Sequence, residues 1–316
     1  MAMEKWSSQL TLILKGMAMG IAEVIPGVSG GTIAFITGIY ERLINTIKTI
    51  LGPEIFKSLR HDGLLGAWKK ADGLFLTMLL GGMVLGIGVG VFGVTHLLEN
   101  YPELLWAFFF GLIIASALYI GRQVTKWGAV EIAILVLGVA VAYFITVASP
   151  AQGSESLVMV FIAGTIAISA LILPGISGSF ILLLMGMYTL IIPTVKDALK
   201  TFNPDSLVIL VVFALGCLLG LATFSRVLSW TFKNYHNQTL ALLTGFMIGS
   251  LNKIWPWRNV LEYRTNSKGE EVPFIEKSVL PSAYDGDPYV LGVIILMLVG
   301  FAAVFALEKL GNKENA

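Results

Sequence analysis

Several stretches of the chain contain no aspartate, glutamate, lysine, arginine or histidine, and each is long enough to cross a membrane as a helix. A bilayer-spanning helix needs roughly 20 mostly apolar residues. Stretches of this kind run over Leu104–Gly121, Ser206–Ser225 and Pro288–Leu307. Only 13% of all residues are charged, whereas a soluble domain carries roughly a quarter. The sequence therefore predicts an all-α polytopic membrane protein.

Composition also excludes several classes of partner and cofactor. The formal net charge of +1 lacks the basic excess of nucleic-acid-binding proteins, so we expect no nucleic acid partner. The single cysteine, Cys217, can form neither an internal disulfide nor a metal cluster. The three histidines share no metal-ligand spacing, so we predict no metal and no other cofactor. The bilayer is the expected environment, and no sequence feature indicates the oligomeric state.

The chain repeats itself, which is a recurrent feature of transporter folds. Around the first Pro-Gly-x-Ser-Gly motif, Pro26 matches Pro174 at a shift of 148 positions, and from Gly82 onward the match resumes at a shift of 134. At the first shift the matched positions are Pro26, Gly27, Ser29, Gly30, Gly38, Tyr40 and Lys48, with Pro174, Gly175, Ser177, Gly178, Gly186, Tyr188 and Lys196. The difference between the two shifts indicates an insertion in the first half, between about Leu51 and Asp72.

Each half is predicted to contain one helical hairpin followed by three spans. The first repeat covers residues 1–152 with its hairpin at 10–45, and the second covers 153–316 with its hairpin at 157–195. The expected spans are Gly73–Leu98, Leu104–Gly121 and Gly128–Ala148 in the first repeat, and Ser206–Ser225, Gln238–Asn252 and Pro288–Leu307 in the second.

Charges in the loops predict the orientation of the chain in the membrane. Basic residues crowd the loop after the first hairpin, which favours a cytoplasmic position for that loop. Three spans are an odd number, so the second repeat enters from the opposite face and the two halves are inverted repeats. Residues 253–287 then form an external loop, and both termini are cytoplasmic.

Each hairpin is interpreted as re-entrant, with its turn near the middle of the bilayer. The run Leu157–Val195 contains no charged residue or histidine, is too long for one span and close to the minimum for two, and is interrupted by Pro174-Gly175. Proline and glycine free backbone polar groups, which in lipid must be satisfied by protein, water or a ligand. If the turns enter from opposite faces, Val24–Thr32 and Ile172–Phe180 meet.

The meeting point of the two turns is a candidate anion site. After each turn a helix begins, and its first N–H groups attract negative charge. Glycines allow close approach of a ligand to the backbone, and hydroxyls add donors. The candidate residues are Gly27, Ser29, Gly30, Gly31 and Thr32 in the first turn, and Gly175, Ser177, Gly178 and Ser179 in the second. The alternative is that these small residues only let helices pack tightly.

Three charged residues complete the candidate set. Glu23 lies just before the first turn, at a position matched by Leu171 in the second half. Because intramembrane carboxylates are costly and usually functional, Glu23 is predicted to bind a coupling proton or sodium ion, the alternative being a structural pair with Lys15. Arg122 and Arg226 lie at cytoplasmic ends of spans and either guide a phosphate inward or only anchor the orientation.

These motifs resemble a known family. The segment Ala22-Glu23-Val24-Ile25-Pro26-Gly27-Val28-Ser29-Gly30-Gly31-Thr32, together with Pro174-Gly175-Ile176-Ser177-Gly178-Ser179, resembles the bacterial polyprenyl-phosphate transporter family. The resemblance covers nearly the whole chain. It implies a multi-pass protein of the bacterial cytoplasmic membrane that returns undecaprenyl phosphate, the lipid carrier for cell-wall precursors, to the inner leaflet. It also implies that the partner is a polyprenyl phosphate lipid.

Two other functions remain as alternatives. Gly20-Ile21-Ala22-Glu23 with Pro26 and Ser29 is also similar to the first motif of undecaprenyl-pyrophosphate phosphatase. In that family a Pro-Gly-x-Ser-Arg-Ser-Gly motif supplies an arginine, but here that position is Gly30 or Gly178. Phosphoryl transfer needs stabilisation of developing charge, so a transporter is favoured over an enzyme. The second alternative is an ion-coupled transporter of a small anion.

Overall fold

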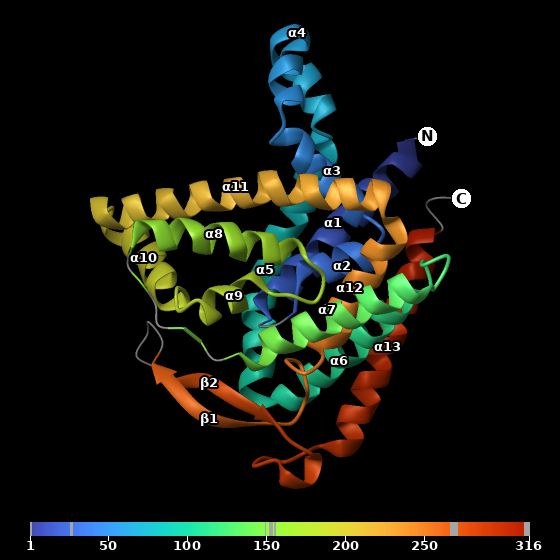
Figure 1. Ribbon diagram of the computed structural model, residues 1–316, viewed down its shortest axis with the longest axis vertical. Coiled ribbons are helices and arrows are strands. Elements are labelled where there is room, and N and C mark those ends of the chain that lie inside the picture. The colour runs from blue at the N-terminus through green and yellow to red at the C-terminus, as the bar shows by residue number, and fades with distance from the viewer. Residues whose placement is uncertain are drawn as a thin grey trace.

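The structure of the chain is a computed structural model, which describes residues 2–25, 28–148, 150, 151, 154, 156–265 and 271–312. It is mostly helical (Figure 1). The first half contains α1 (Ala2–Val24), α2 (Gly30–Ile36), α3 (Tyr40–Ile50), α4 (Pro53–Lys70), α5 (Gly73–Asn100), α6 (Pro102–Gly121) and α7 (Ala129–Val147). The second half contains α8 (Leu157–Ile172), α9 (Gly178–Leu184), α10 (Tyr188–Thr201), α11 (Pro204–Asn234), α12 (His236–Ser250), β1 (Arg258–Thr265), β2 (Glu271–Ser278), the short helix η1 (Pro281–Ala283) and α13 (Val290–Asn312). The expected repeat boundary at 152 and 153 lies outside the described residues.

The second arm of each expected hairpin is broken into two helices at a glycine. Gly38 separates α2 from α3, and Gly186 separates α9 from α10. These glycines have φ values of 72° and 67°, a region that glycine adopts without strain. Between α9 and α10 the chain bends by 118°. Because Gly38 and Gly186 are matched positions of the sequence repeat, both halves share this break, which the sequence analysis did not predict.

All six spans expected from the sequence are helical. Four of these helices, α5, α6, α7 and α11, are long and apolar enough to cross a bilayer, and the bent pair α9–α10 would add a fifth if it forms one span. Helix α12 has 15 residues, and the apolar part of α13 is Val290–Ala306, so both are shorter. Proline begins α4, α6 and α11, where its missing N–H has no helical partner to lose.

The spans pair across the two halves. In each half the first hairpin arm packs along the first span, α1 with α5 and α8 with α11. The remaining spans exchange partners, so that α6 packs along α13 and α7 along α12. The approach of α6 and α13 depends on glycine, because a Cβ added to Gly111 would lie 1.9 Å from the Met297 carbonyl oxygen. Helices α6 and α12 also contact each other, beside α2, whose seven residues are all buried.

The expected external loop is partly a β-hairpin, which corrects the prediction of a purely helical protein. Strands β1 and β2 pair antiparallel from Arg258 with Ser278 to Thr265 with Glu271. Two tryptophans in the segment before β1 hold the base of the hairpin, because Trp255 Nε1 donates to the Val279 carbonyl just after β2 and Trp257 Nε1 donates to the Pro288 carbonyl just before α13, both at 2.8 Å. The pairing of the two strands and the tryptophan hydrogen bonds join segments that are far apart in the sequence. The local pattern of apolar residues therefore did not predict the hairpin.

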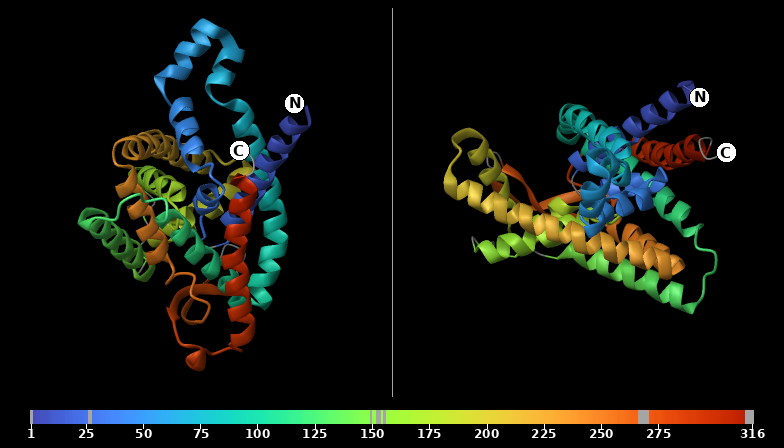
Figure 2. Two further views of the ribbon diagram at one scale, coloured as in Figure 1. Left: turned by 90° about the vertical axis from the view of Figure 1, so that its right-hand side faces the viewer. Right: turned by 90° about the horizontal axis from the view of Figure 1, so that it is seen from above.

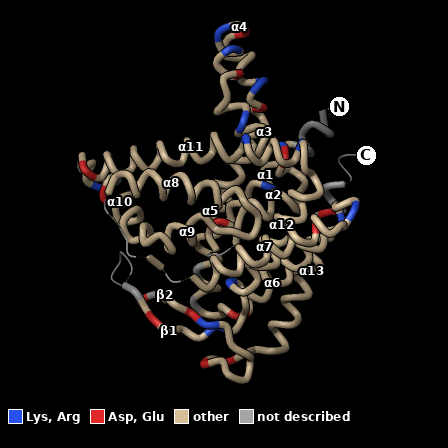
Figure 3. Tube along the Cα trace, in the orientation of Figure 1, with Lys and Arg blue, Asp and Glu red and all other residues tan. Residues whose placement is uncertain are grey.

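Charged residues lie mostly at the periphery of the molecule (Figure 3). Helix α4 carries one group of charged residues and the strands β1 and β2 carry another, and smaller groups lie at the outer end of α10 and α11 and beside the start of α12, while most of the helical interior is free of charge. Helix α4 occupies the insertion expected between Leu51 and Asp72, and it protrudes from the other helices (Figure 2). This separation of charge is what a protein with an apolar belt between two watery faces requires.

Candidate functional site

The first turn lies between α1 and α2, and its hydroxyl groups are used within the protein. Ser29 caps α2 by accepting the Gly31 N–H at 3.1 Å. The same hydroxyl donates toward the carbonyl oxygens of Leu171 and Leu173 in the second half, 3.2 and 3.1 Å away. Ser29 is fully buried, and these bonds satisfy its hydroxyl group within the protein. Of the candidate residues in this turn, Gly27 lies outside the described residues.

The second turn, between α8 and α9, rests directly against the first. Gly175 has a φ of 81° and donates its backbone N–H to Thr32 Oγ1 at 3.1 Å. A Cβ on Gly31 would lie 2.6 Å from the Ile172 carbonyl oxygen, so the backbones touch without room for a side chain. The expected meeting of Val24–Thr32 with Ile172–Phe180 is confirmed by these contacts.

The two turns differ in how the helix that follows is capped. At the first turn, a carboxylate oxygen of Glu23 accepts the Gly30 N–H at 2.8 Å, so the chain supplies its own anion there. At the second turn, Leu171 occupies the matching position and Ser177 makes no side-chain cap bond. Its hydroxyl instead lies 2.9 Å from that of Ser179. A bound anion would therefore find more unpaired N–H groups at the second turn than at the first.

A small cavity adjoins the second turn. It is lined by Gly175, Ile176, Ser177 and Phe180 of the turn and α9, by Ala142, Ile145 and Thr146 of α7, and by Ser250 and Lys253 at the end of α12. The cavity measures about 10 Å³, which is about the room that one water molecule needs. A phosphate group does not fit in this conformation, so binding one requires the surrounding segments to move apart.

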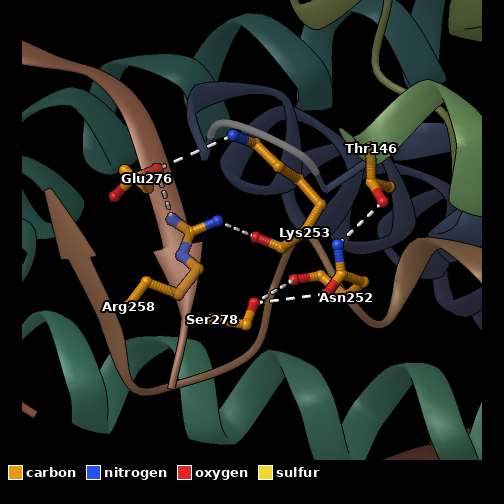
Figure 4. Close-up of polar contacts among 6 residues, drawn as sticks. All are labelled: Thr146, Asn252, Lys253, Arg258, Glu276 and Ser278. Atoms are coloured by element: carbon orange, nitrogen blue, oxygen red, sulfur yellow. Dashed lines mark hydrogen bonds and ion pairs between the residues drawn. The ribbon is translucent and has the colours of Figure 1, made fainter. Parts of the chain in front are cut away.

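Lys253 is the cation among the residues that line this cavity, and it belongs to a partly buried charged group (Figure 4). Its Nζ lies 3.6 Å from Glu276 Oε2 and 4.5 Å from the centre of the Phe180 ring. Arg258 Nη2 is 2.9 Å from the same Glu276 oxygen, and Arg258 also donates to the Lys253 carbonyl. Burial, with the nearby positive charge of Arg258, lowers the pKa of Lys253 to about 8, although Glu276 acts in the opposite direction.

Neighbouring hydrogen bonds hold this segment in place. Asn252 donates to Thr146 Oγ1 on α7 at 2.9 Å, and Ser278 Oγ on β2 donates to Asn252 Oδ1 at 3.2 Å. The β-hairpin is thereby linked to the end of α12 and to α7 (Figure 4).

The sequence analysis did not identify Lys253 as a site residue, because it assigned this lysine to the start of the external loop. One signal was available, since this lysine follows an apolar segment directly and precedes Trp255 and Trp257. Tryptophans of this kind mark the membrane interface, which would place the lysine close to the apolar layer rather than in open water.

The two arginines predicted as site residues lie elsewhere. Arg226 donates to the carbonyl oxygens of Ala222 and Leu51, which ties α11 to the end of α3. Arg122 is exposed just after α6, with its guanidinium 5.7 Å from the Phe305 ring. Neither lines the cavity at the second turn. Among the residues that the structure describes, no group of three or more His, Cys, Asp or Glu side chains is arranged to hold a metal ion.

Comparison with known proteins adds an independent line of support. The model of a family described as undecaprenyl phosphate translocase-like matches residues 19–272. A polyprenyl-phosphate transporter of Vibrio cholerae is 44% identical over 313 residues, which cover 98% of this chain and 99% of that protein. A polyprenyl-phosphate transporter of Staphylococcus aureus is 31% identical over 256 residues, covering 77% of this chain and 85% of that protein. No solved structure matches the chain. The chain therefore belongs to the undecaprenyl phosphate translocase-like family, as the resemblance of its two hairpin motifs indicated.

Proposed function

We propose that this protein carries undecaprenyl phosphate, or a closely related polyprenyl phosphate, across the bacterial cytoplasmic membrane by flipping its head group between leaflets. The observation that carries the proposal is the contact between the two turns through Gly175 and Thr32. Beside this contact, the cavity at the second turn gathers polar backbone, hydroxyls and the partly buried Lys253. The names of the two relatives agree with this substrate.

A polar site of this kind addresses the main barrier to lipid flipping. Moving an ionised phosphate through hydrocarbon is very costly unless charge and hydrogen bonds compensate it. The prenyl tail can stay in lipid throughout, so only the head group needs a path through the protein. In the proposed site the head group contacts Gly175, Ser177, Gly178 and Ser179, after the two turns separate from each other.

We infer that the two halves are inverted repeats and that each hairpin is re-entrant. Matching breaks at Gly38 and Gly186, and the exchanged pairing of α6 with α13 and α7 with α12, support a two-fold relationship. The start of α1 and the end of α13 lie on the side of the molecule from which the basic helix α4 protrudes (Figure 1), which supports cytoplasmic termini.

Glu23 is the proposed site for a coupling proton or sodium ion. Its carboxylate contacts Gly30 at the start of α2, next to the turn that must move when a head group binds. Protonation or ion binding there would change the charge beside the two turns, which gives the ion a way to favour one conformation over another.

Reconstitution into liposomes tests this function. Polyprenyl phosphate is placed in the outer leaflet, and its accessibility to an impermeant phosphatase is followed with time. The proposal requires that protein-containing liposomes move head groups to the inner leaflet and that empty liposomes do not. Two controls separate the alternatives: release of phosphate from polyprenyl diphosphate indicates an enzyme, and uptake of radiolabelled inorganic phosphate indicates a small-anion transporter.

A further inference from the structure

We propose that Lys253 is the cationic ligand of the phosphate head group, and that Glu276 is the internal anion that the phosphate replaces beside it. This inference rests on the proposed function and deepens it, because it names the side chain that recognises the negative charge and the contact that must break.

The position of Lys253 brings its charge to the second turn. Helix α12 has 15 residues, about 22 Å at 1.5 Å per residue, which is shorter than the roughly 30 Å of a hydrocarbon core. If α12 is a span, at least one of its two ends therefore lies below the membrane surface, and the end that precedes Lys253 is next to Trp255 and Trp257. Lys253 lines the same cavity as Gly175 and Ser177, so a phosphate oxygen at this turn would reach the amine, a hydroxyl and the backbone together.

The charges around Lys253 are incompletely balanced. Lys253 and Arg258 share the Glu276 carboxylate, and both cations are largely buried, with 19% and 7% of their side-chain surface exposed. Buried charges are stable only when they are paired. Burial and the charge of Arg258 lower the pKa of Lys253, which means that one shared carboxylate does not fully compensate the ammonium. A second anion at the cavity would complete this balance.

The contact of Lys253 with Glu276 is the weaker of the two ion pairs. Arg258 approaches Glu276 to 2.9 Å, a normal distance for a charged hydrogen bond, whereas Lys253 remains 3.6 Å away. Lys253 can therefore turn to a phosphate while Arg258 keeps Glu276 paired. The Phe180 ring, 4.5 Å from Nζ, supports the ammonium from another side during the exchange.

The ligand chemistry is that of a phosphate monoester, borne either by a lipid or by free phosphate. The detergent-solubilised full-length protein is titrated with farnesyl phosphate, with farnesol and with inorganic phosphate. We expect farnesyl phosphate to bind more tightly than inorganic phosphate, because apolar residues such as Ile145 and Phe180 border the cavity. Tighter binding of inorganic phosphate would assign the site to the free ion and overturn the lipid assignment.

Four substitutions test the exchange. Lys253→Met should weaken farnesyl phosphate binding at least tenfold, in keeping with the strength of a charge-assisted hydrogen bond, and Lys253→Arg should recover part of the affinity. Glu276→Gln should tighten binding several-fold, because the competing anion is removed. A gain of this kind cannot come from misfolding. Lys277→Met, at an exposed lysine of β2 next to Glu276, is the matched control and should leave binding unchanged.

The double variant Lys253→Met with Glu276→Gln decides whether the two residues act on each other. The proposal requires that the gain from Glu276→Gln disappears when Lys253 is absent, which is a coupling between neighbours. Equal affinity of Lys253→Met and the unchanged protein would overturn the inference while the liposome assay leaves the proposed function intact. If the unchanged protein neither binds nor moves a prenyl phosphate, both proposals fail together.

Discussion

The backbone N–H of Gly175 donates a hydrogen bond to Thr32 Oγ1 at 3.1 Å, and this contact joins turns from opposite halves of the chain. Thr32 is fully buried, so bulk water does not compete for this bond. Ser29 reinforces the junction through the carbonyl oxygens of Leu171 and Leu173. The proposed head-group path therefore runs through a place where the two halves hold each other, and transport requires these bonds to break and re-form.

Removing the Thr32 hydroxyl should destabilise this junction. Thr32→Val keeps the shape of the side chain but leaves the Gly175 N–H without its acceptor, which costs about 1–3 kcal/mol for a buried group. We expect a lower melting temperature of the detergent-purified protein and slower head-group movement. Thr32→Ser retains the hydroxyl and should stay close to the original protein in both measurements. Equal melting temperatures for the Val and Ser variants would show that the bond contributes little.

Close backbone contact at the turns gives a second prediction. In Gly31→Ala the new Cβ would lie 2.6 Å from the Ile172 carbonyl oxygen, so the turns must separate, at a cost of about 1–3 kcal/mol for overpacking. Gly81→Ala is the matched control, because a Cβ there meets no atom within 4 Å. The melting temperature should fall in the first variant and stay or rise in the second. A harmless Gly31→Ala change would argue against tight contact between the turns.

The inverted arrangement predicts which side each end of the molecule faces. Lys57 on α4 and Lys277 on β2 are both exposed, at opposite ends of the molecule (Figure 3). After replacement of Cys217 by serine, Lys57→Cys should react with an impermeant maleimide only from the cytoplasmic side, and Lys277→Cys only from outside. Labelling of both from the same side would disprove the proposed orientation.

Much of this architecture could be predicted because the information is local. Charge-free runs such as Leu104–Gly121 predicted spans, and the repeated Pro-Gly-x-Ser-Gly motif predicted two turns that meet. The break at Gly38 and its counterpart Gly186 was missed, because a glycine inside an apolar run does not by itself reveal a positive φ.

The polar side of the site was less predictable because it depends on segments distant in sequence. Lys253 reaches the second turn only because α12 is short and the following strands fold back to supply Glu276. Similarly, the sequence marked Glu23 as unusual but did not reveal that its carboxylate caps α2 through Gly30. The sequence shows that a charged residue such as Glu23 lies in an apolar run, but only the packing of the folded chain determines which groups it contacts.

Replacing Glu23 tests whether it couples an ion to transport. Glu23→Gln keeps an oxygen that can accept the Gly30 N–H, which is now 2.8 Å from the carboxylate, but it removes the charge and the ability to gain or lose a proton. We expect the rate of head-group movement to lose its dependence on pH or on sodium concentration, while the protein remains folded. If the variant follows the same pH and sodium profiles as the original protein, Glu23 has no coupling role.

Lys253 predicts a specific change of stability with pH. Burial lowers the pKa of Lys253 from an ordinary value of 10.5 to about 8 in the folded protein. Between these two values the unfolded chain still holds a proton that the folded protein has released, so raising the pH favours folding. The contribution amounts to at most about 1.4 kcal/mol per pH unit within this window, and it is constant below pH 8.

A comparison with Lys253→Met isolates this contribution, because all other groups titrate in both proteins. The melting temperature of the original protein minus that of the variant should increase as the pH rises from about 8 to about 10.5. At lower pH this difference should stay constant. If the two plots of melting temperature against pH are parallel over the whole range, Lys253 keeps its ordinary pKa. Its ammonium group is then not destabilised by burial, and the argument that it needs a second anion fails.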